Sequence, residues 1–291
     1  MKIHYTDGRE FELEYDDIKH SYVVDGDKIP SVTRVIDSCF PKYLVDWAVQ
    51  EGASFFLQSL EPYRKPDPAT FIIPQRVVEH IHQGILTASK AISEQAADVG
   101  NQVHRWISEG IKWKMGQRDS APEIPEDDEE VSNCIHAFIQ WASKNEIEWI
   151  TTEEKIYYDD DENSPSKYSY AGTADAVAIV NGMPCVIDFK TSKKVYKPYY
   201  LQLAAYQYAI RLMHQFDTAP RGIILRLDKR SGVYEEKKFD TAGHIDTFFR
   251  CIDVRQWGSK RIKQVSWSYD KELRGPDNER RDKVGDSMGK G

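Results

Sequence analysis

Two acidic residues and one lysine occur at spacings that could bring them to one point on a β-sheet. Asp188 and Lys190 are two residues apart within an apolar stretch, and Asp175 lies in an earlier apolar stretch. Side chains two residues apart on a strand share a face, so Asp188 and Lys190 should point the same way and Phe189 the other. The intervening Asn181-Gly182 is typical of a tight hairpin turn. The pattern therefore predicts two paired strands with two carboxylates and one ammonium group at a common site.

Such a site suits the hydrolysis of a phosphodiester bond. Two carboxylates can hold one or two divalent cations, which neutralise the scissile phosphate and lower the pKa of a bound water. A lysine can orient or deprotonate that water, or stabilise the charge that develops on phosphorus. A carboxylate in an apolar strand, as at Asp188, also requires a cation beside it, because an unpaired buried charge is costly. The alternative interpretation is a surface hairpin with a structural Asp–Lys pair.

The elements that precede this hairpin are predicted to be a small sheet followed by helices. Residues 1–30 alternate apolar and polar side chains, which is typical of an antiparallel hairpin or meander. Residues 31–146 have the composition and period of a helical region, and Ser31 is the expected N-cap of its first helix. A helix is predicted over residues 75–113, and the pattern leaves open whether it breaks near Gly84.

The elements that carry and follow the hairpin are predicted to form the core. Residues 147–258 contain clustered strands, with helices expected over 199–214 and 244–257. Residues 259–291 form a charged C-terminal extension that we expect to be disordered from about residue 270. The predicted fold class is α/β (α+β), with a mixed, mainly antiparallel sheet flanked by helices and a helical N-terminal part.

Composition narrows the class of protein. The chain has 291 residues, of which 40% are hydrophobic and 30% charged, as in soluble globular proteins. No apolar run approaches the ~20 residues of a membrane-spanning helix, and the polar start lacks a secretory signal, so we expect a cytoplasmic protein without membrane contact. The net charge of −8 argues against a basic DNA binder. It does not exclude a nuclease, because a metal site needs carboxylates and a local basic patch can hold DNA.

The cysteines argue against two kinds of metal centre. No pair has the close spacing of a zinc site, and no group has the spacing of an iron–sulfur cluster. We therefore expect reduced, mostly buried thiols at Cys39, Cys134, Cys185 and Cys251.

These motifs together resemble the PD-(D/E)xK nuclease superfamily, specifically its RecB-like branch. Gly172-Thr-Ala-Asp175, the hairpin and Asp188-Phe-Lys190 occur in the order of that family's core. Gln202-Leu-Ala-Ala-Tyr206 resembles the Gln-x-x-x-Tyr motif on the following helix. The resemblance implies a restriction-endonuclease-like core.

Two upstream segments extend the resemblance to about residues 18–257. Gly100-Asn-Gln-Val-His104 resembles a helical motif whose histidine is a metal ligand in many members. Ile29-Pro-Ser-Val-Thr33 resembles the start of phage-type exonucleases and of the mitochondrial genome maintenance exonuclease. The helical region over residues 31–146 would then supply the histidine and a cover over the substrate path.

The resemblance implies roles for individual residues. Asp175 and Asp188 would be metal ligands together with the backbone carbonyl of Phe189, and Lys190 would be catalytic. His104 would be a further ligand, although a lone histidine on a helix is more often a satisfied core or surface residue. The implied cofactor is Mg²⁺ or Mn²⁺, as one or two ions, and neutral imidazole suits manganese somewhat better.

One more acid is expected on the strand before Gly-x-x-Asp. Glu153 and Glu154 both qualify by position, and strand alternation should direct only one of them towards the site. Glu153 is chosen as the catalytic candidate because it lies three residues before Ile156, the spacing associated with the family. The other glutamate would then be solvated.

Several polar residues after the catalytic lysine are candidates for DNA contact. Gln202 and Tyr206 lie one helical turn apart and share a face, so they could position the lysine strand, the DNA backbone or a base. Ordinary helix packing is the alternative. The segment after Lys190 could grip phosphates or be only a solvated basic face, and its candidates are Thr191, Ser192, Lys193 and Lys194.

The resulting functional hypothesis is a metal-dependent deoxyribonuclease in a bacterial or phage-infected host cell. The resemblance favours an exonuclease acting on single-stranded ends during recombination, repair or phage genome processing. A structure-specific endonuclease on the same core and a non-catalytic nucleic-acid-binding module are the alternatives. DNA is the expected partner, with a recombination or helicase protein as a further candidate. The sequence does not indicate an oligomeric state.

Overall fold

The computed structural model describes residues 1–40, 45–64, 73–159, 166–216, 218–239 and 243–259. Residues Met1–Gln256 form one compact unit, and Trp257–Gly291 are grouped separately. The predicted disorder from about residue 270 lies outside the described residues. No described helix has both the length and the apolar character needed to cross a membrane.

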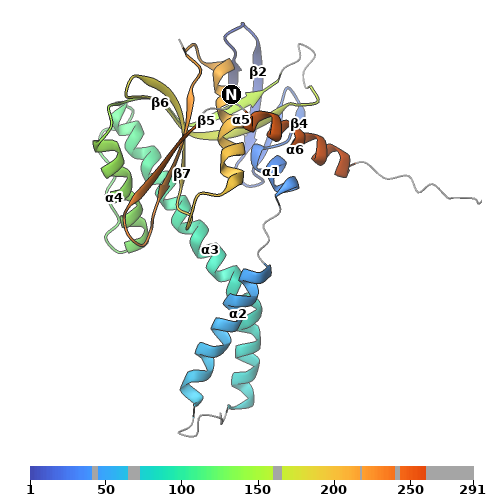
Figure 1. Ribbon diagram of the computed structural model, residues 1–291, viewed down its shortest axis with the longest axis vertical. Coiled ribbons are helices and arrows are strands. Elements are labelled where there is room, and N and C mark those ends of the chain that lie inside the picture. Colours follow the sequence, from blue (N-terminus) through green and yellow to red (C-terminus); the bar gives the residue numbers. More distant parts are fainter. Residues whose placement is uncertain (41–44, 65–72, 160–165, 217, 240–242, 260–291) are drawn as a thin grey trace, which may run out of the picture. The chain divides into compact units, whose positions relative to one another are not determined.

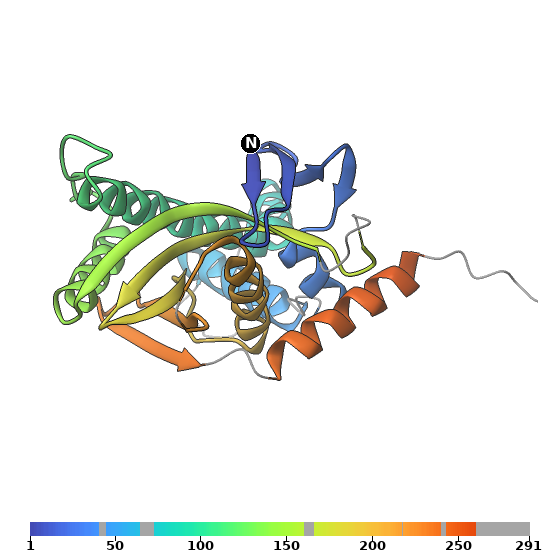
Figure 2. The same cartoon turned by 90° about the horizontal axis from the view of Figure 1, so that it is seen from above.

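The central element is a five-stranded sheet with strands in the order β5-β6-β7-β8-β9. Its strands are β5 (Ile147–Tyr158), β6 (Tyr170–Val180), β7 (Met183–Lys190), β8 (Arg221–Leu227) and β9 (Tyr234–Phe239). Only β7 and β8 pair in parallel, and the other neighbours are antiparallel. Figure 2 shows β5 and β6 as long, curved neighbours. The predicted α+β class with a mixed, mainly antiparallel sheet is confirmed.

The β6–β7 hairpin forms as its turn residues predict. Asn181 and Gly182 have φ values of 51° and 77°, which is the left-handed conformation that a two-residue type I′ turn requires at both positions. Val180 and Met183 pair directly across the turn. This turn sets the register that places the acids of the two strands.

Helices cover both faces of the sheet (Figure 1). Side chains on one face pack with α3 (Gln75–Lys114) and α4 (Glu129–Ser143). Side chains on the other face pack with α1 (Val32–Cys39), α5 (Lys197–Met213) and α6 (His244–Ser259). On β7 the alternation is regular: Ile187 and Phe189 belong to the first core and Val186 to the second. Asp188 therefore lies on the face of the sheet that α5 covers.

The first 30 residues form a separate antiparallel meander. Its strands are β1 (Lys2–His4), β2 (Glu10–Asp16), β3 (Ser21–Val24) and β4 (Asp27–Ile29). The meander packs on the central sheet, since its core includes Tyr157 of β5 and Ala171 of β6. The predicted N-cap is also present, because the Ser31 side chain accepts a hydrogen bond from the Arg34 amide at the start of α1.

Helix α3 is continuous over 40 residues and does not break at Gly84. Gly84 is instead a contact with α2 (Val45–Leu60), which the short helix η1 (Glu61–Tyr63) follows. A Cβ atom at position 84 would lie 2.1 Å from the ring of Phe55 in α2. The glycine therefore permits the close approach of two helices, and it does not end one.

Candidate active site

Asp188 and Lys190 form a buried ion pair at the end of β7. Lys190 Nζ donates to Asp188 Oδ1 at 2.8 Å and lies 2.6 Å from Oδ2. The Asp188 side chain is 1% exposed and that of Lys190 is 15% exposed. The cation expected beside this buried carboxylate is therefore its own strand neighbour. The ammonium also lies 4.9 Å from the ring centroid of Tyr199, which adds a cation–π contact.

Asp175 and His104 meet beside this pair. Asp175 Oδ2 accepts a hydrogen bond from the Phe189 amide at 2.8 Å, which joins β6 to β7. Asp175 Oδ1 lies 3.4 Å from His104 Nδ1, and the His104 ring packs edge-on to the Phe189 ring. The structure thus brings together Asp175, Asp188, Lys190 and His104.

The apolar stripe of α3 accounts for the position of His104. This stripe is buried against the sheet and α4, and it contains Val99, Val103, Ile107 and Ile111. His104 follows Val103 on the edge of that stripe, where its side chain is 35% exposed and turns towards Asp175. A histidine on a core-packed helix is in this case also beside two carboxylates.

The four groups shift one another's pKa values, because each lies close to charges of the others. Burial raises the pKa of Asp188 to about 6, although Lys190 acts in the opposite direction. Burial also opposes ionisation of Asp175, but His104 and Lys190 outweigh it and hold the pKa of Asp175 below its usual range. Burial lowers the pKa of His104 and of Lys190, but the two carboxylates outweigh burial and raise both. The two carboxylates therefore favour the charged forms of His104 and Lys190, while burial acts against the charge on Asp188.

The donor set at this point fits a divalent cation. An imidazole nitrogen and two carboxylates suit Mn²⁺, and carboxylates suit Mg²⁺. Asp188 Oδ2 is buried, and the ammonium of Lys190 is the cation that now lies 2.6 Å from it. A divalent cation could take that place. In the described ranges, no three His, Cys, Asp or Glu side chains are already gathered as ligands. A cation here therefore requires Lys190 to release part of its contact with Asp188.

The Gln-x-x-x-Tyr motif supports the site from α5. Gln202 Nε2 donates to the Tyr206 hydroxyl at 3.0 Å, so the two side chains share a face as predicted. Tyr206 is buried, and its ring lies against Gly172 in the Gly-x-x-Asp segment of β6. The direct DNA contact predicted for Tyr206 is not available to a buried side chain. The motif instead packs under the strand that carries Asp175.

Glu153 does not join the cluster. Its side chain is 53% exposed and lies 3.3 Å from Lys112 Nζ of α3. Glu154 is more enclosed, and its Oε1 lies 2.7 Å from His214 Nε2 at the end of α5. The choice of Glu153 by its spacing from Ile156 is therefore not supported by this geometry. Strand alternation does not apply at this point, because Glu153 has a φ of 52° and its backbone is not extended there.

The segment after Lys190 is held by backbone contacts. Arg226 Nη1 donates to the Ser192 carbonyl at 3.4 Å, and the Ser192 hydroxyl donates to the Lys194 carbonyl at 2.9 Å. Lys193 and Lys194 are exposed. Thr191 is partly buried beside Gly100 of α3: a Cβ atom added to Gly100 would lie 3.4 Å from the Thr191 hydroxyl. The exposed lysines therefore project from a fixed loop.

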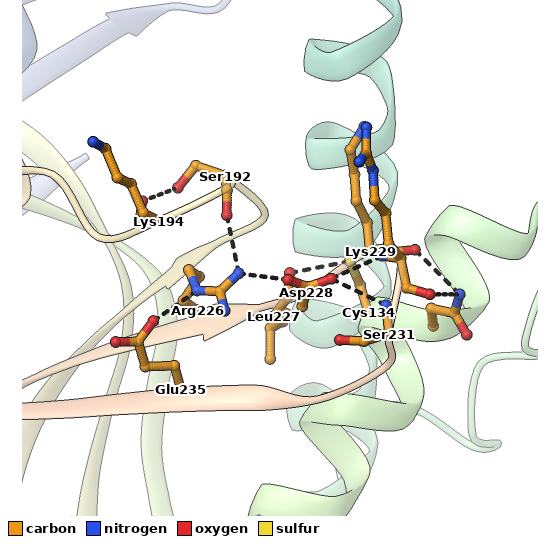
Figure 3. A network of polar contacts seen from close by, with 11 residues as sticks. Cys134, Ser192, Lys194, Arg226, Leu227, Asp228, Lys229, Ser231 and Glu235 are labelled. Atoms are coloured by element: carbon orange, nitrogen blue, oxygen red, sulfur yellow. Dashed lines mark hydrogen bonds and ion pairs between the residues drawn. The ribbon is translucent and has the colours of Figure 1, made fainter.

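Arg226 was not foreseen from the sequence. It pairs with Lys190 in the β7–β8 register and is held by Asp228 and Glu235, each at 2.8 Å (Figure 3). Its side chain is 14% exposed. One sequence signal was available, since Arg226 interrupts the apolar stretch Ile223-Ile-Leu225 and Leu227.

Comparison with known proteins adds little to this geometry. No family model matches the chain, and no curated protein matches it significantly. Among solved structures, the crystal structure of SSO0001 is similar at 14% sequence identity and a TM-score of 0.35, covering 72% of this chain and 86% of that one. The function therefore has to be inferred from the site itself.

Proposed function

We propose that the chain is a metal-dependent deoxyribonuclease of the PD-(D/E)xK type. The observation that supports it is the convergence of Asp175, Asp188 and Lys190 with His104 from a distant helix. Two carboxylates, an imidazole and a lysine at one end of a sheet form a donor set for divalent cations next to a group that can assist a nucleophile. A merely structural Asp–Lys pair would not require His104 and Asp175 beside it.

The residues divide into ligands and a reacting group. Asp175, Asp188, His104 and the Phe189 carbonyl would hold Mg²⁺ or Mn²⁺, which when bound supplies charge neutralisation at the phosphate and an acidified water. Lys190 would orient the attacking water or stabilise charge on the phosphate oxygens. To reach either, its ammonium has to leave at least one oxygen of Asp188, which it now contacts at 2.8 and 2.6 Å.

Within this class we propose exonuclease action on single-stranded ends, with roles in recombination, repair or phage genome processing. This choice follows the resemblance of the opening segment to phage-type exonucleases and to the mitochondrial genome maintenance exonuclease. The exposed Lys193 and Lys194 would contact the DNA backbone near the reacting group. A structure-specific endonuclease and a non-catalytic binding module are the competing functions.

The test is cleavage of end-labelled linear single-stranded DNA and of a closed circle of the same sequence, with Mn²⁺ or Mg²⁺. Wild type is compared with Lys190→Ala, and with Lys112→Ala as a control lysine outside the cluster. We expect degradation of the linear strand alone, lost in EDTA and in Lys190→Ala but retained in the control. Cutting of the circle identifies an endonuclease. Binding without cleavage of either substrate identifies the non-catalytic module.

A further inference from the structure

We propose that Lys155, with Thr173 and Tyr15, forms a phosphate-binding subsite for the DNA strand next to the catalytic carboxylates. The inference rests on the proposed nuclease function for the identity of its ligand. Its structural basis is separate, because none of these residues belongs to the cluster around Lys190.

The subsite lies on the same face of β6 as Asp175. Lys155 of β5 pairs directly with Thr173 of β6. Thr173 and Asp175 are two residues apart on the strand, so their side chains share a face and are separated by about 6–7 Å. One nucleotide can bridge that distance, so a strand whose scissile phosphate lies at Asp175 would bring a neighbouring phosphate to Lys155.

The groups at the subsite are rich in hydrogen-bond donors. Lys155 Nζ donates to Thr173 Oγ1 at 3.0 Å, and Thr173 Oγ1 in turn lies 2.9 Å from the Tyr22 hydroxyl. An ammonium group carries three donor hydrogens. The contact with Thr173 uses one of them, and the remaining hydrogens have no acceptor among the described residues. An external acceptor with several oxygens, such as a phosphate, would satisfy them.

The charge of Lys155 is also unmatched. No described carboxylate lies within ion-pair distance of its nitrogen, and the nearest acids that act on it are Asp17 and Glu153 at longer range. Glu153 is itself paired with Lys112. Burial lowers the pKa of Lys155, and the two distant acids do not offset it. A half-buried cation without a counter-ion favours the binding of an anion.

Aromatic rings fix the ammonium in place. Lys155 Nζ lies 4.1 Å from the ring centroid of Tyr15, and that ring packs against Tyr22 at 4.7 Å between centroids. The Tyr15 hydroxyl is held in turn by His20 at 2.8 Å. A cation that is already immobilised loses little conformational entropy when it binds a phosphate.

The experiment measures the binding of a fluorescent single-stranded oligonucleotide in EDTA, which prevents turnover, over a range of salt concentrations. Lys155→Gln is compared with wild type, with Lys155→Arg, and with Lys112→Gln as a control lysine already neutralised by Glu153. We expect Lys155→Gln to weaken binding about tenfold and to reduce the slope of log affinity against log salt by about 0.7, the value for one phosphate of a single strand. Lys155→Arg and Lys112→Gln should retain the wild-type slope.

A second measurement needs neither DNA nor a variant that folds poorly. Inorganic phosphate is titrated into ¹⁵N-lysine-labelled wild type, and the side-chain NH₃⁺ signal of Lys155, assigned with Lys155→Arg, should shift. If wild type cleaves DNA but Lys155→Gln changes neither affinity nor slope, the subsite is wrong and the nuclease function stands. If wild type neither binds nor cleaves DNA while phosphate moves the Lys155 signal, the anion site stands and the nuclease function fails. If wild type neither binds nor cleaves DNA and phosphate leaves the Lys155 signal unchanged, both the subsite and the nuclease function fail.

Discussion

The ring of Tyr206 lies directly against Gly172, so closely that a Cβ atom at position 172 would be 2.8 Å from Tyr206 Cε1. The two residues are 34 positions apart and belong to different sequence motifs. Gly172 precedes Asp175 by three residues in β6, so this contact fixes the distance between α5 and the part of β6 that carries Asp175. The motifs are therefore parts of one packed unit.

Gly172→Ala should destabilise the fold by about 1–3 kcal/mol, since the buried tyrosine has little room to move. Gly110→Ala in α3 is the matched control, because its new Cβ would meet Trp106 only at 3.7 Å. That control should be neutral or more stable by about 0.5–1 kcal/mol through helix propensity. Urea denaturation of both variants measures the difference. Equal stability of the two variants would contradict the proposed contact.

Lys190→Met should separate catalysis from metal binding. Removing the ammonium leaves the buried Asp188 without a partner, so the metal-free variant should lose about 3–5 kcal/mol of stability at pH 7. Mn²⁺ should then stabilise the variant more than wild type, because no ammonium competes for Asp188. Thermal melting with and without Mn²⁺ measures this, and nuclease activity should be absent throughout. A smaller Mn²⁺ effect in the variant than in wild type would remove Asp188 from the ligand set.

Arg226→Lys should lower the turnover rate without removing the fold. Lysine cannot make the forked contacts to Asp228 and Glu235 and still reach the Ser192 carbonyl. The loop after Lys190 should then be less well positioned, and we expect a loss of about tenfold in kcat. Steady-state kinetics should show a nearly unchanged KM. Wild-type kcat in this variant would mean that the network serves only stability.

Asp228 should contribute to acid stability. Its hydrogen bonds with Arg226 and with the amides of Ser231 and Arg230 hold the pKa of Asp228 well below its usual range. A depressed folded-state pKa gives stability that is complete above the unfolded pKa of about 3.9 and is lost as pH falls towards the folded value. Asp228→Asn should therefore be less stable than wild type by about 1–2 kcal/mol at pH 7, and this difference should shrink below about pH 4.

The pH series needs a control on an exposed acid. Asp37 is exposed on α1, away from this network, and Asp37→Asn should follow the wild-type curve of unfolding free energy against pH. A constant gap between wild type and Asp228→Asn from pH 7 to pH 3 would show that the asparagine acts through packing and not through charge.

Glu153→Gln should leave activity within about threefold of wild type and change stability by less than ~0.5 kcal/mol, because its contact with Lys112 is an exposed ion pair. Activity on single-stranded DNA and urea denaturation test both statements. A hundredfold loss of activity would mean that Glu153 leaves Lys112 and reaches the reacting centre in the DNA complex.

The features that the sequence predicted well depend on neighbours in the chain. The turn at Asn181-Gly182 follows from two residues that tolerate positive φ, and the Asp188–Lys190 pair follows from the two-residue repeat of a regular strand. The cap at Ser31 is likewise a contact across three residues. Local rules sufficed for each of these.

The features that it missed depend on distant partners or on irregular backbone. The residues around Gly84 are helical on both sides. The reason for a glycine at this position is the ring of Phe55, which belongs to another helix. Strand alternation failed at Glu153 because the backbone turns to positive φ there. The role of Arg226 depends on Ser192, which the chain brings close only after folding. A single sequence does not name the partner in any of these contacts: the charge at Arg226 stands out in an apolar strand, but nothing in the sequence points to Ser192.

Helix α3 is continuous from Gln75 to Lys114, so it forms a rigid connection between its contact with α2 and the candidate site. About 30 Å of helix, at 1.5 Å per residue, connects Gly84, where α2 is clamped, to His104 beside Asp175. Helices bend sharply at a proline, a π-bulge or a break in the backbone hydrogen bonds, and a helix without these features has no hinge. A displacement of α2 would therefore be transmitted along α3 to the His104 imidazole. Under the proposed function, events far from the sheet would then alter the distance between His104 and Asp175.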